Sequence, residues 1–248
     1  MAQFTMAIAG HTARVTSLFD STKDYCSRYL TAEAPEFSIT VTRENLAFEQ
    51  DFLLREALEE GIRVRKFTDP FLERAAIQRA FAEYLFPRNA LLMHGSTVAV
   101  DGNAYLFTAK CGTGKSTHTR LWRQVFGGRA VMVNDDKPFL RITETGVLAC
   151  GAPWSGKHGL DCNIAVPLKG ICVLNRGSEN RIRKASPEEV LPLLEKQGCI
   201  PLDPGKYPQY LSLIHILAQS VPLWQMECTK EEQAALISHA AMSEDEIN

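Results

Sequence analysis

The chain has 248 residues, of which 45% are hydrophobic and 23% are charged, a composition typical of a soluble globular protein. Its 27 Lys and Arg against 29 Asp and Glu leave a formal net charge of −2, so no surface for nucleic acid is expected. Seven cysteines without a C-x-x-C pair, and no signal peptide or membrane span, predict a cytoplasmic protein with reduced thiols and no membrane partner.

The first third of the chain predicts a small α+β unit over residues 1–87. Asp69-Pro70 begins its longest helix, whose apolar face is typical of a core, and Pro87 follows the end of that helix. We expect this helix to pack the unit, which carries no catalytic constellation, onto the rest of the chain. Its other predicted elements are two strands within 3–18, a short helix at 21–30, and strands at 37–42, 53–57 and 62–66.

The second part, residues 88–248, opens with a predicted hairpin. Strands at 91–100 and 104–109 flank Asp101-Gly102, a dipeptide typical of a tight turn. His94 lies on the first of these strands, where a lone histidine is usually a core residue with satisfied hydrogen bonds.

A phosphate-binding loop is predicted directly after this hairpin. It departs from G-x-x-x-x-G-K-[ST] only at the first position, where Ala109 requires a negative φ. Glycines let the backbone wrap a phosphate, and the following helix offers unpaired N–H groups. Lys115 supplies a charge at the β- and γ-phosphates, and Ser116 supplies a hydroxyl ligand for Mg²⁺. The predicted nucleotide-binding residues are Cys111, Gly112, Thr113, Gly114, Lys115, Ser116 and Thr117.

Two adjacent carboxylates come soon after this loop. A helix is expected at 117–126, and the apolar run at 130–133 leads to Asn134-Asp135-Asp136. Such a stretch alone is typical of a turn. After a phosphate-binding loop, the two aspartates suit a metal ligand and a general base side by side.

Two further cations are candidates for binding substrate. Lys157 lies in the long loop 151–168, whose length indicates function or mobility, and it suits a phosphate or a substrate carboxylate. Arg176 ends a buried strand at 169–175 and either reaches the phosphates or caps a surface turn. The other predicted elements are a hairpin of 139–143 and 147–150, strands at 181–184 and 221–228, and helices from Ser186, at 210–219 and at 230–242, the last capped by Thr229 with Glu232.

The segments around the loop and the aspartate pair resemble a known family. HGSTVAVDGNAYLFTAKCGTGKST followed by VNDD is similar to the catalytic domain of HPr kinase/phosphorylase and its relatives, which share a core with ATP-dependent phosphoenolpyruvate carboxykinase. The resemblance covers roughly residues 88–230 and is most specific over 94–136. It implies an α/β fold, a phosphoenolpyruvate carboxykinase/HPr kinase-like P-loop core of mixed sheet and helices, to which the small N-terminal unit is added.

The same resemblance implies roles for the site residues. Asp135 would be the general base, Ser116 and Asp136 would hold Mg²⁺, and Lys115 would bind the phosphates of ATP. It also places His94 near the phosphates, because relatives carry a histidine-glycine pair there. Which aspartate takes which role rests on the resemblance alone.

We therefore expect an ATP- and Mg²⁺-dependent kinase that moves the γ-phosphate to a hydroxyl of a protein or peptide serine or of a small molecule. The family forms homo-oligomers, so one is possible here. Thr117 stands where bifunctional HPr kinases carry a glutamate, so neither HPr as substrate nor a phosphorylase reaction is implied.

Two alternatives remain. A phosphoenolpyruvate carboxykinase-like enzyme would need further basic and metal-binding motifs that are not found. A nucleotide-binding regulatory protein with little turnover would have little use for the retained pair of Asp135 and Asp136.

Overall fold

A computed structural model of the chain describes residues 1–59, 61 and 66–244. The strand expected at 62–66 lies outside these residues, except for Lys66. Within the described ranges, every helix is too short or too polar to cross a bilayer.

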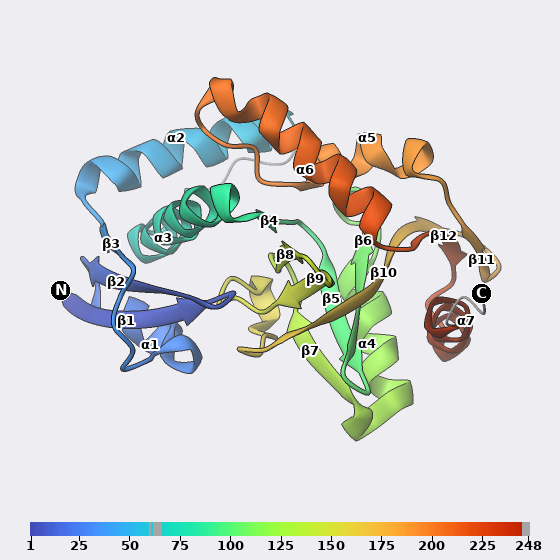
Figure 1. The fold of residues 1–248 in the computed structure, drawn as a ribbon. Coiled ribbons are helices and arrows are strands. Elements are labelled where there is room, and N and C mark those ends of the chain that lie inside the picture. The colour runs from blue at the N-terminus through green and yellow to red at the C-terminus, as the bar shows by residue number, and fades with distance from the viewer. Residues whose placement is uncertain (60, 62–65, 245–248) are drawn as a thin grey trace. The chain divides into compact units, whose positions relative to one another are not determined.

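The chain divides into two compact units, Met1–Leu85 and Phe86–Asn248. Each unit combines helices with a β-sheet, as Figure 1 shows, so the expectation of a mixed α/β protein is confirmed.

The first unit is built on a three-stranded sheet in the order β1-β2-β3. β2 pairs antiparallel with β1 and parallel with β3, and three α-helices complete the unit. Its elements are β1 (Ala2–Ile8), β2 (His11–Ser17), α1 (Asp20–Tyr25), β3 (Phe37–Thr40), α2 (Arg43–Glu59) and α3 (Asp69–Leu85).

The strand expected at 53–57 is wrong, because these residues belong to helix α2. The segment is rich in Leu, Glu, Ala and Arg, which favour helices, and it contains no β-branched residue. The helix also has an N-terminal cap, in which Thr42 N donates to Asn45 Oδ1 at 2.9 Å and Asn45 N donates to Thr42 Oγ1 at 3.4 Å.

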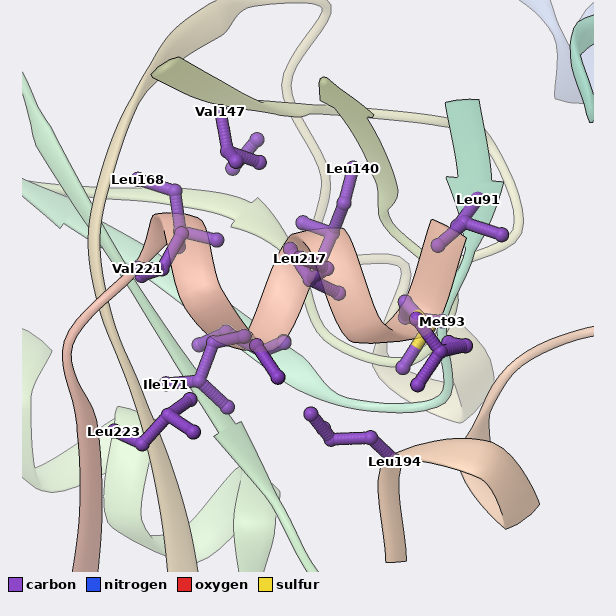
Figure 2. Close-up of a cluster of buried hydrophobic side chains, with 14 of the residues drawn as sticks. Leu91, Met93, Leu140, Val147, Leu168, Ile171, Leu194, Leu217, Val221 and Leu223 are labelled. Atoms are coloured by element: carbon purple, nitrogen blue, oxygen red, sulfur yellow. The ribbon is translucent and has the colours of Figure 1, made fainter. Parts of the chain in front are cut away.

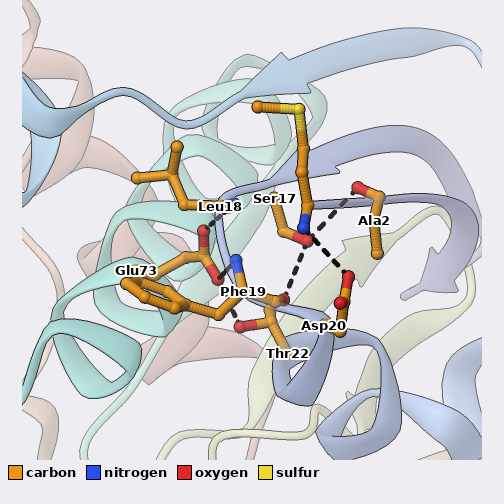
Figure 3. Close-up of polar contacts among 8 residues, drawn as sticks. Ala2, Ser17, Leu18, Phe19, Asp20, Thr22 and Glu73 are labelled. Atoms are coloured by element: carbon orange, nitrogen blue, oxygen red, sulfur yellow. Dashed lines mark hydrogen bonds and ion pairs between the residues drawn. The ribbon is translucent and has the colours of Figure 1, made fainter.

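A buried carboxylate joins helix α3 to the turn before α1. Glu73 is fully buried and accepts hydrogen bonds from the amides of Leu18 and Phe19 and from the Thr22 hydroxyl (Figure 3). These three donors satisfy the buried carboxyl oxygens, so Glu73 is a structural residue of the first unit.

The second unit contains a nine-stranded mixed sheet. The strand order is β4-β8-β9-β10-β6-β5-β7, with β12 beside β10 and β11 beside β12. β10 runs parallel to β6 and β12, whereas the other neighbouring pairs are antiparallel. The strands are β4 (Ala90–Leu92), β5 (Ser96–Val100), β6 (Asn103–Thr108), β7 (Ala130–Asn134), β8 (Phe139–Thr143), β9 (Gly146–Cys150), β10 (Ala165–Arg176), β11 (Arg181–Lys184) and β12 (Leu223–Cys228).

Four helices pack against this sheet and complete two hydrophobic cores, one on each side of it. Alternation along β6 directs Leu106 into one core and Phe107 into the other. The first core, drawn in Figure 2, also takes Leu194 and Leu217 from α5 and α6. The second takes Trp122 from α4, together with side chains of α7. The helices are α4 (Lys115–Phe126), α5 (Pro187–Gln197), α6 (Tyr207–Ser220) and α7 (Glu232–Ser243).

The single strand expected at 91–100 is divided into β4 and β5. Residues of the break bond elsewhere, because His94 N donates to Gln197 O at 2.7 Å and Gly95 N donates to Asp136 O at 3.0 Å. Gly95 also lies so close to β6 that an added Cβ would be 2.5 Å from Leu106 Cδ1. His94 therefore lies in the break rather than inside a strand.

The capping box expected at the last helix is also wrong. α7 begins at Glu232, and Thr229 instead accepts a hydrogen bond from Asn180 Nδ2 at 3.3 Å. By contrast, the helix expected from Ser186 is confirmed as α5, and the side chains of Ser186 and Glu189 form a capping box at its start. The turn at Asp101-Gly102 is confirmed too, with β5 and β6 paired as an antiparallel hairpin on either side of it.

Candidate active site

The sheet brings the predicted site residues to one edge. β5 is antiparallel to both β6 and β7, so β6 and β7 point the same way, and β10 is parallel to β6. The carboxyl ends of β6, β7 and β10 and the start of β5 therefore meet at this edge. The glycine-rich loop follows β6, and the aspartate pair follows β7. Arg176 is the last residue of β10, and Ser96 is the first residue of β5.

The glycine-rich loop after β6 has backbone angles that its glycines permit. Gly112 and Gly114 have φ of 74° and 126°, a region that favours glycine. The φ of Ala109 is not positive, as expected for an alanine at this position. Gly114 is the N-cap of α4 and provides no side-chain cap for the helix amides. The Lys115 side chain is buried, and its Nζ donates to Ala109 O at 3.2 Å.

Arg176 holds the same loop from the neighbouring strand. Its Nε donates to Thr113 O at 3.3 Å, and its guanidinium also bonds to Gly112 O. In this conformation the arginine binds backbone carbonyls of the loop and stands at the end of β10.

Asp135 is buried and connected to the helix that follows the loop. Its Oδ1 accepts a hydrogen bond of 2.7 Å from the Ser96 hydroxyl. The Ser96 oxygen is also 2.7 Å from Thr119 Oγ1, on the second turn of α4. The carboxylate and the loop helix are thus joined through two hydroxyls.

Asp136 is partly exposed and lies beside His94. The Asn134 side chain fixes the turn, because its Oδ1 accepts from the amides of Asp136 and Lys137 at 2.8 and 2.6 Å. His94 Nε2 is 3.4 Å from Asp136 Oδ1. The turn therefore presents the Asp136 carboxylate toward the histidine.

Burial and two lysines set the protonation of this pair. Burial, together with the charges of Lys137 and Lys115, lowers the pKa of His94 to about 3, so its imidazole is neutral near pH 7. Burial raises the pKa of Asp136, with Asp135 adding to the rise and the same two lysines opposing it. The contact between His94 and Asp136 is consequently not an ion pair at neutral pH.

The loop after β9 packs over the aspartate turn. Asp135 N donates to Leu160 O at 3.1 Å, and Asn134 Nδ2 donates to Ala152 O at 2.6 Å. An added Cβ at Gly156 would lie 3.4 Å from the Asp136 Cβ. This part of the expected loop therefore forms a wall of the site.

The remaining predicted residues are more exposed. Ser116 and Cys111 are exposed, and Thr117 is half-buried. Lys157 is exposed on a short 3-10 turn, and among the described residues it forms no ion pair. The structure therefore brings Lys115, His94, Asp135 and Asp136 together, whereas Lys157 forms no hydrogen bond or ion pair with them among the described residues.

Three polar residues that shape the site were not among the predicted site residues. Ser96 and Thr119 join Asp135 to α4, and Asn134 shapes the aspartate turn. Ser96 directly follows the histidine-glycine pair, which is the only signal that marked it. Thr119 carries no sequence signal of its own.

The side chains at this edge include oxygen donors of the kind that Mg²⁺ prefers. Across the described ranges, no group of three or more His, Cys, Asp or Glu side chains is arranged to hold a metal ion. Mg²⁺ usually takes one or two protein oxygens and completes its shell with phosphate oxygens and waters, so the Ser116 hydroxyl and the Asp136 carboxylate fit it.

Comparisons with known proteins show similarity to solved structures only. No family model and no curated protein matches the chain. Among solved structures, the Hpr(Ser) kinase/phosphatase from Coxiella burnetii is similar with a TM-score of 0.37 and 10% sequence identity, over 61% of this chain and 94% of that chain. The relation is distant at the level of the fold and carries no inference about activity.

Proposed function

We propose that the chain is an ATP- and Mg²⁺-dependent phosphotransferase that moves the γ-phosphoryl group to a hydroxyl of a protein, a peptide or a small molecule. The main support is the hydrogen-bonded connection between the aspartate pair and helix α4, which follows the glycine-rich loop. A buried carboxylate, Asp135, is fixed through hydroxyls to the helix that begins with the loop residue Lys115.

The loop residues 111–117 fit the phosphates of a nucleotide. Gly112 has open space beside its Cα, where an added Cβ would meet no atom within 4 Å, and the amides at the start of α4 have no side-chain cap. A helix N-terminus of this kind binds anions. Lys115 brings the positive charge, and its Nζ exchanges the Ala109 carbonyl for a phosphate oxygen.

Ser116 and Asp136 are the proposed ligands of the metal. The Ser116 hydroxyl is exposed and has no side-chain hydrogen bond among the described residues. When bound, Mg²⁺ neutralises charge on the β- and γ-phosphates. The neutral His94 lies beside Asp136 and orients that carboxylate without competing for it as a cation.

Asp135 is the proposed general base. Ser96 occupies its Oδ1, and Oδ2 has no hydrogen-bond partner among the described residues. Oδ2 of Asp135 takes the proton from the hydroxyl group of the phosphoryl acceptor. The oxygen of that hydroxyl bonds to the γ-phosphorus, the bond to the β-phosphate oxygen breaks, and ADP leaves. Proton transfer of this kind contributes about 10²- to 10⁴-fold to a rate.

The test is to incubate the protein with γ-labelled ATP, Mg²⁺ and an extract of its source organism, and then to separate macromolecules from small metabolites. Label in one fraction, above that in extract alone, is expected and identifies the class of acceptor. ATP binding without label in either fraction would overturn the proposal and favour a nucleotide-binding regulator. Release of CO₂ from oxaloacetate in the presence of ATP would instead favour a carboxykinase.

A further inference from the structure

We propose that Ser96 is a positioning residue that orders a chain of hydrogen bonds from Thr119 to Asp135 and thereby selects the carboxylate oxygen that faces the acceptor. This inference rests on the proposed phosphotransfer function and deepens it. It assigns a role to two residues outside the phosphate-binding loop and the aspartate pair.

The three side chains come from different elements and are all buried. Ser96 begins β5 and is 0% exposed, Thr119 on α4 is 1% exposed, and Asp135 after β7 is 6% exposed. Both contacts of the Ser96 oxygen are 2.7 Å, the usual distance for a hydrogen bond between two oxygens. Water does not separate groups that lie this close.

The direction of each bond follows from the number of protons. The Ser96 hydroxyl donates to Asp135 Oδ1, so its single proton points to that oxygen. The Ser96 oxygen then has only lone pairs left for Thr119, which must donate. Other acceptors near Thr119, the carbonyl oxygens of Lys115 and Ser116, are both 3.4 Å away and compete weakly.

This ordering has two consequences for the site. Oδ1 of Asp135 is occupied and its carboxylate cannot rotate freely, so Oδ2 is held as the free proton acceptor. The chain of hydrogen bonds also reaches helix α4, because its last member, Thr119, lies one helical turn beyond Lys115, the first residue of that helix. The base and the phosphate-binding loop are therefore kept in a fixed relative position, on which transfer depends steeply.

The neighbouring residue Thr97 provides a matched control. It follows Ser96 on β5 and is equally buried, but its hydroxyl has no hydrogen-bond partner among the described residues. Thr97→Val removes a buried hydroxyl from the same strand and leaves the chain of hydrogen bonds intact.

The experiment compares Ser96→Ala, Thr119→Val, Thr119→Ser and Thr97→Val in the labelled-ATP transfer assay. We expect Ser96→Ala to lower kcat about 10- to 100-fold, because the base is misplaced. KM and Kd for ATP should stay within about twofold, because the interaction acts in the transition state. Thr119→Val should lower kcat less than Ser96→Ala, Thr119→Ser should restore it, and Thr97→Val should keep the wild-type value.

Coupling between the two hydroxyls separates the possible failures. The double variant Ser96→Ala with Thr119→Val should lose no more kcat than Ser96→Ala alone, and its shift in denaturant midpoint should be smaller than the sum of the single shifts. Wild-type kcat in Ser96→Ala, or an equal loss in Thr97→Val, would overturn the role of Ser96 while leaving phosphotransfer intact. If the wild-type protein transfers no label, the proposed function is overturned instead. In that case the denaturant midpoints still test the hydrogen bonds, because additive shifts of the two single variants would contradict the chain of hydrogen bonds from Thr119 to Asp135.

Discussion

The Nε of Arg176, at the end of β10, donates a hydrogen bond of 3.3 Å to the carbonyl oxygen of Thr113 in the glycine-rich loop. The same guanidinium bonds to the carbonyl oxygen of Gly112. Carbonyls held in this way keep the loop in one conformation. Arg176 therefore acts on the loop from the neighbouring strand.

Replacing this arginine should weaken nucleotide binding. We expect Arg176→Met to raise the Kd of both ATP and ADP about fivefold, because exposed charge-assisted hydrogen bonds contribute on the order of 1 kcal/mol. Isothermal titration calorimetry measures both constants, and Arg181→Met is the control at another exposed arginine. A loss confined to ATP would contradict loop positioning and indicate contact with the γ-phosphate.

Removing the loop lysine should abolish most transfer. Lys115 is the buried cation of the loop, so Lys115→Met should lower the rate of phosphoryl transfer by about 10²- to 10³-fold. Lys110→Met, at an exposed position of the same loop, should keep the wild-type rate. The transfer assay measures both variants. Equal rates in the two would remove Lys115 from the site.

Gly151, which packs against β7, the strand that precedes the aspartate pair, should be essential for stability. A Cβ at Gly151 would overlap Cys162 O and lie 3.0 Å from Val133 O, both of which are backbone atoms. Gly151→Ala should therefore destabilise the protein by about 1–3 kcal/mol. Gly128→Ala is the control, because its Cβ would meet nothing within 4 Å. Chemical denaturation distinguishes them, and similar midpoints would contradict the close packing.

A buried histidine behind the loop should make stability depend on pH. Burial lowers the pKa of His118 to about 4 from the 6.5 of an exposed histidine. Below pH 6.5 the unfolded chain binds more protons at this site, so stability falls as the pH drops toward 4, by up to about 1.4 kcal/mol per pH unit.

The variant His118→Gln tests this dependence. Unfolding free energies of the variant should fall less steeply between pH 6.5 and 4 than those of the wild type. Some slope should remain, because the lowered pKa of His94 acts with the same sign, whereas the raised pKa of Asp136 acts against it. Identical slopes in the two proteins would contradict a neutral, buried His118.

Local patterns predicted the elements whose signals are local. The Asp101-Gly102 turn and the helix start at Ser186 each depend on a few adjacent residues, and both are confirmed. The strand expected at 53–57 failed because a short window of apolar residues does not distinguish a strand from one face of a helix.

The site itself was only partly predictable. The loop and the aspartate pair carry sequence motifs, whereas the contacts of Ser96 with Thr119 and Asp135 join residues 23 and 39 positions apart. The break at His94 depends on how closely Gly95 approaches β6, which no single segment reveals. Such relations arise from the order of strands in the sheet and so appear only in the folded chain.

The proposed base gives the most direct test of the central claim. Asp135→Asn keeps an oxygen that can accept from Ser96 but cannot take up a proton from the acceptor. Transfer from γ-labelled ATP and the Kd of ATP should be measured for this variant, with Asp101→Asn, a surface partner of Arg129, as control. We predict a transfer rate about 10²- to 10⁴-fold below wild type with an unchanged Kd. Wild-type transfer by Asp135→Asn would contradict the account.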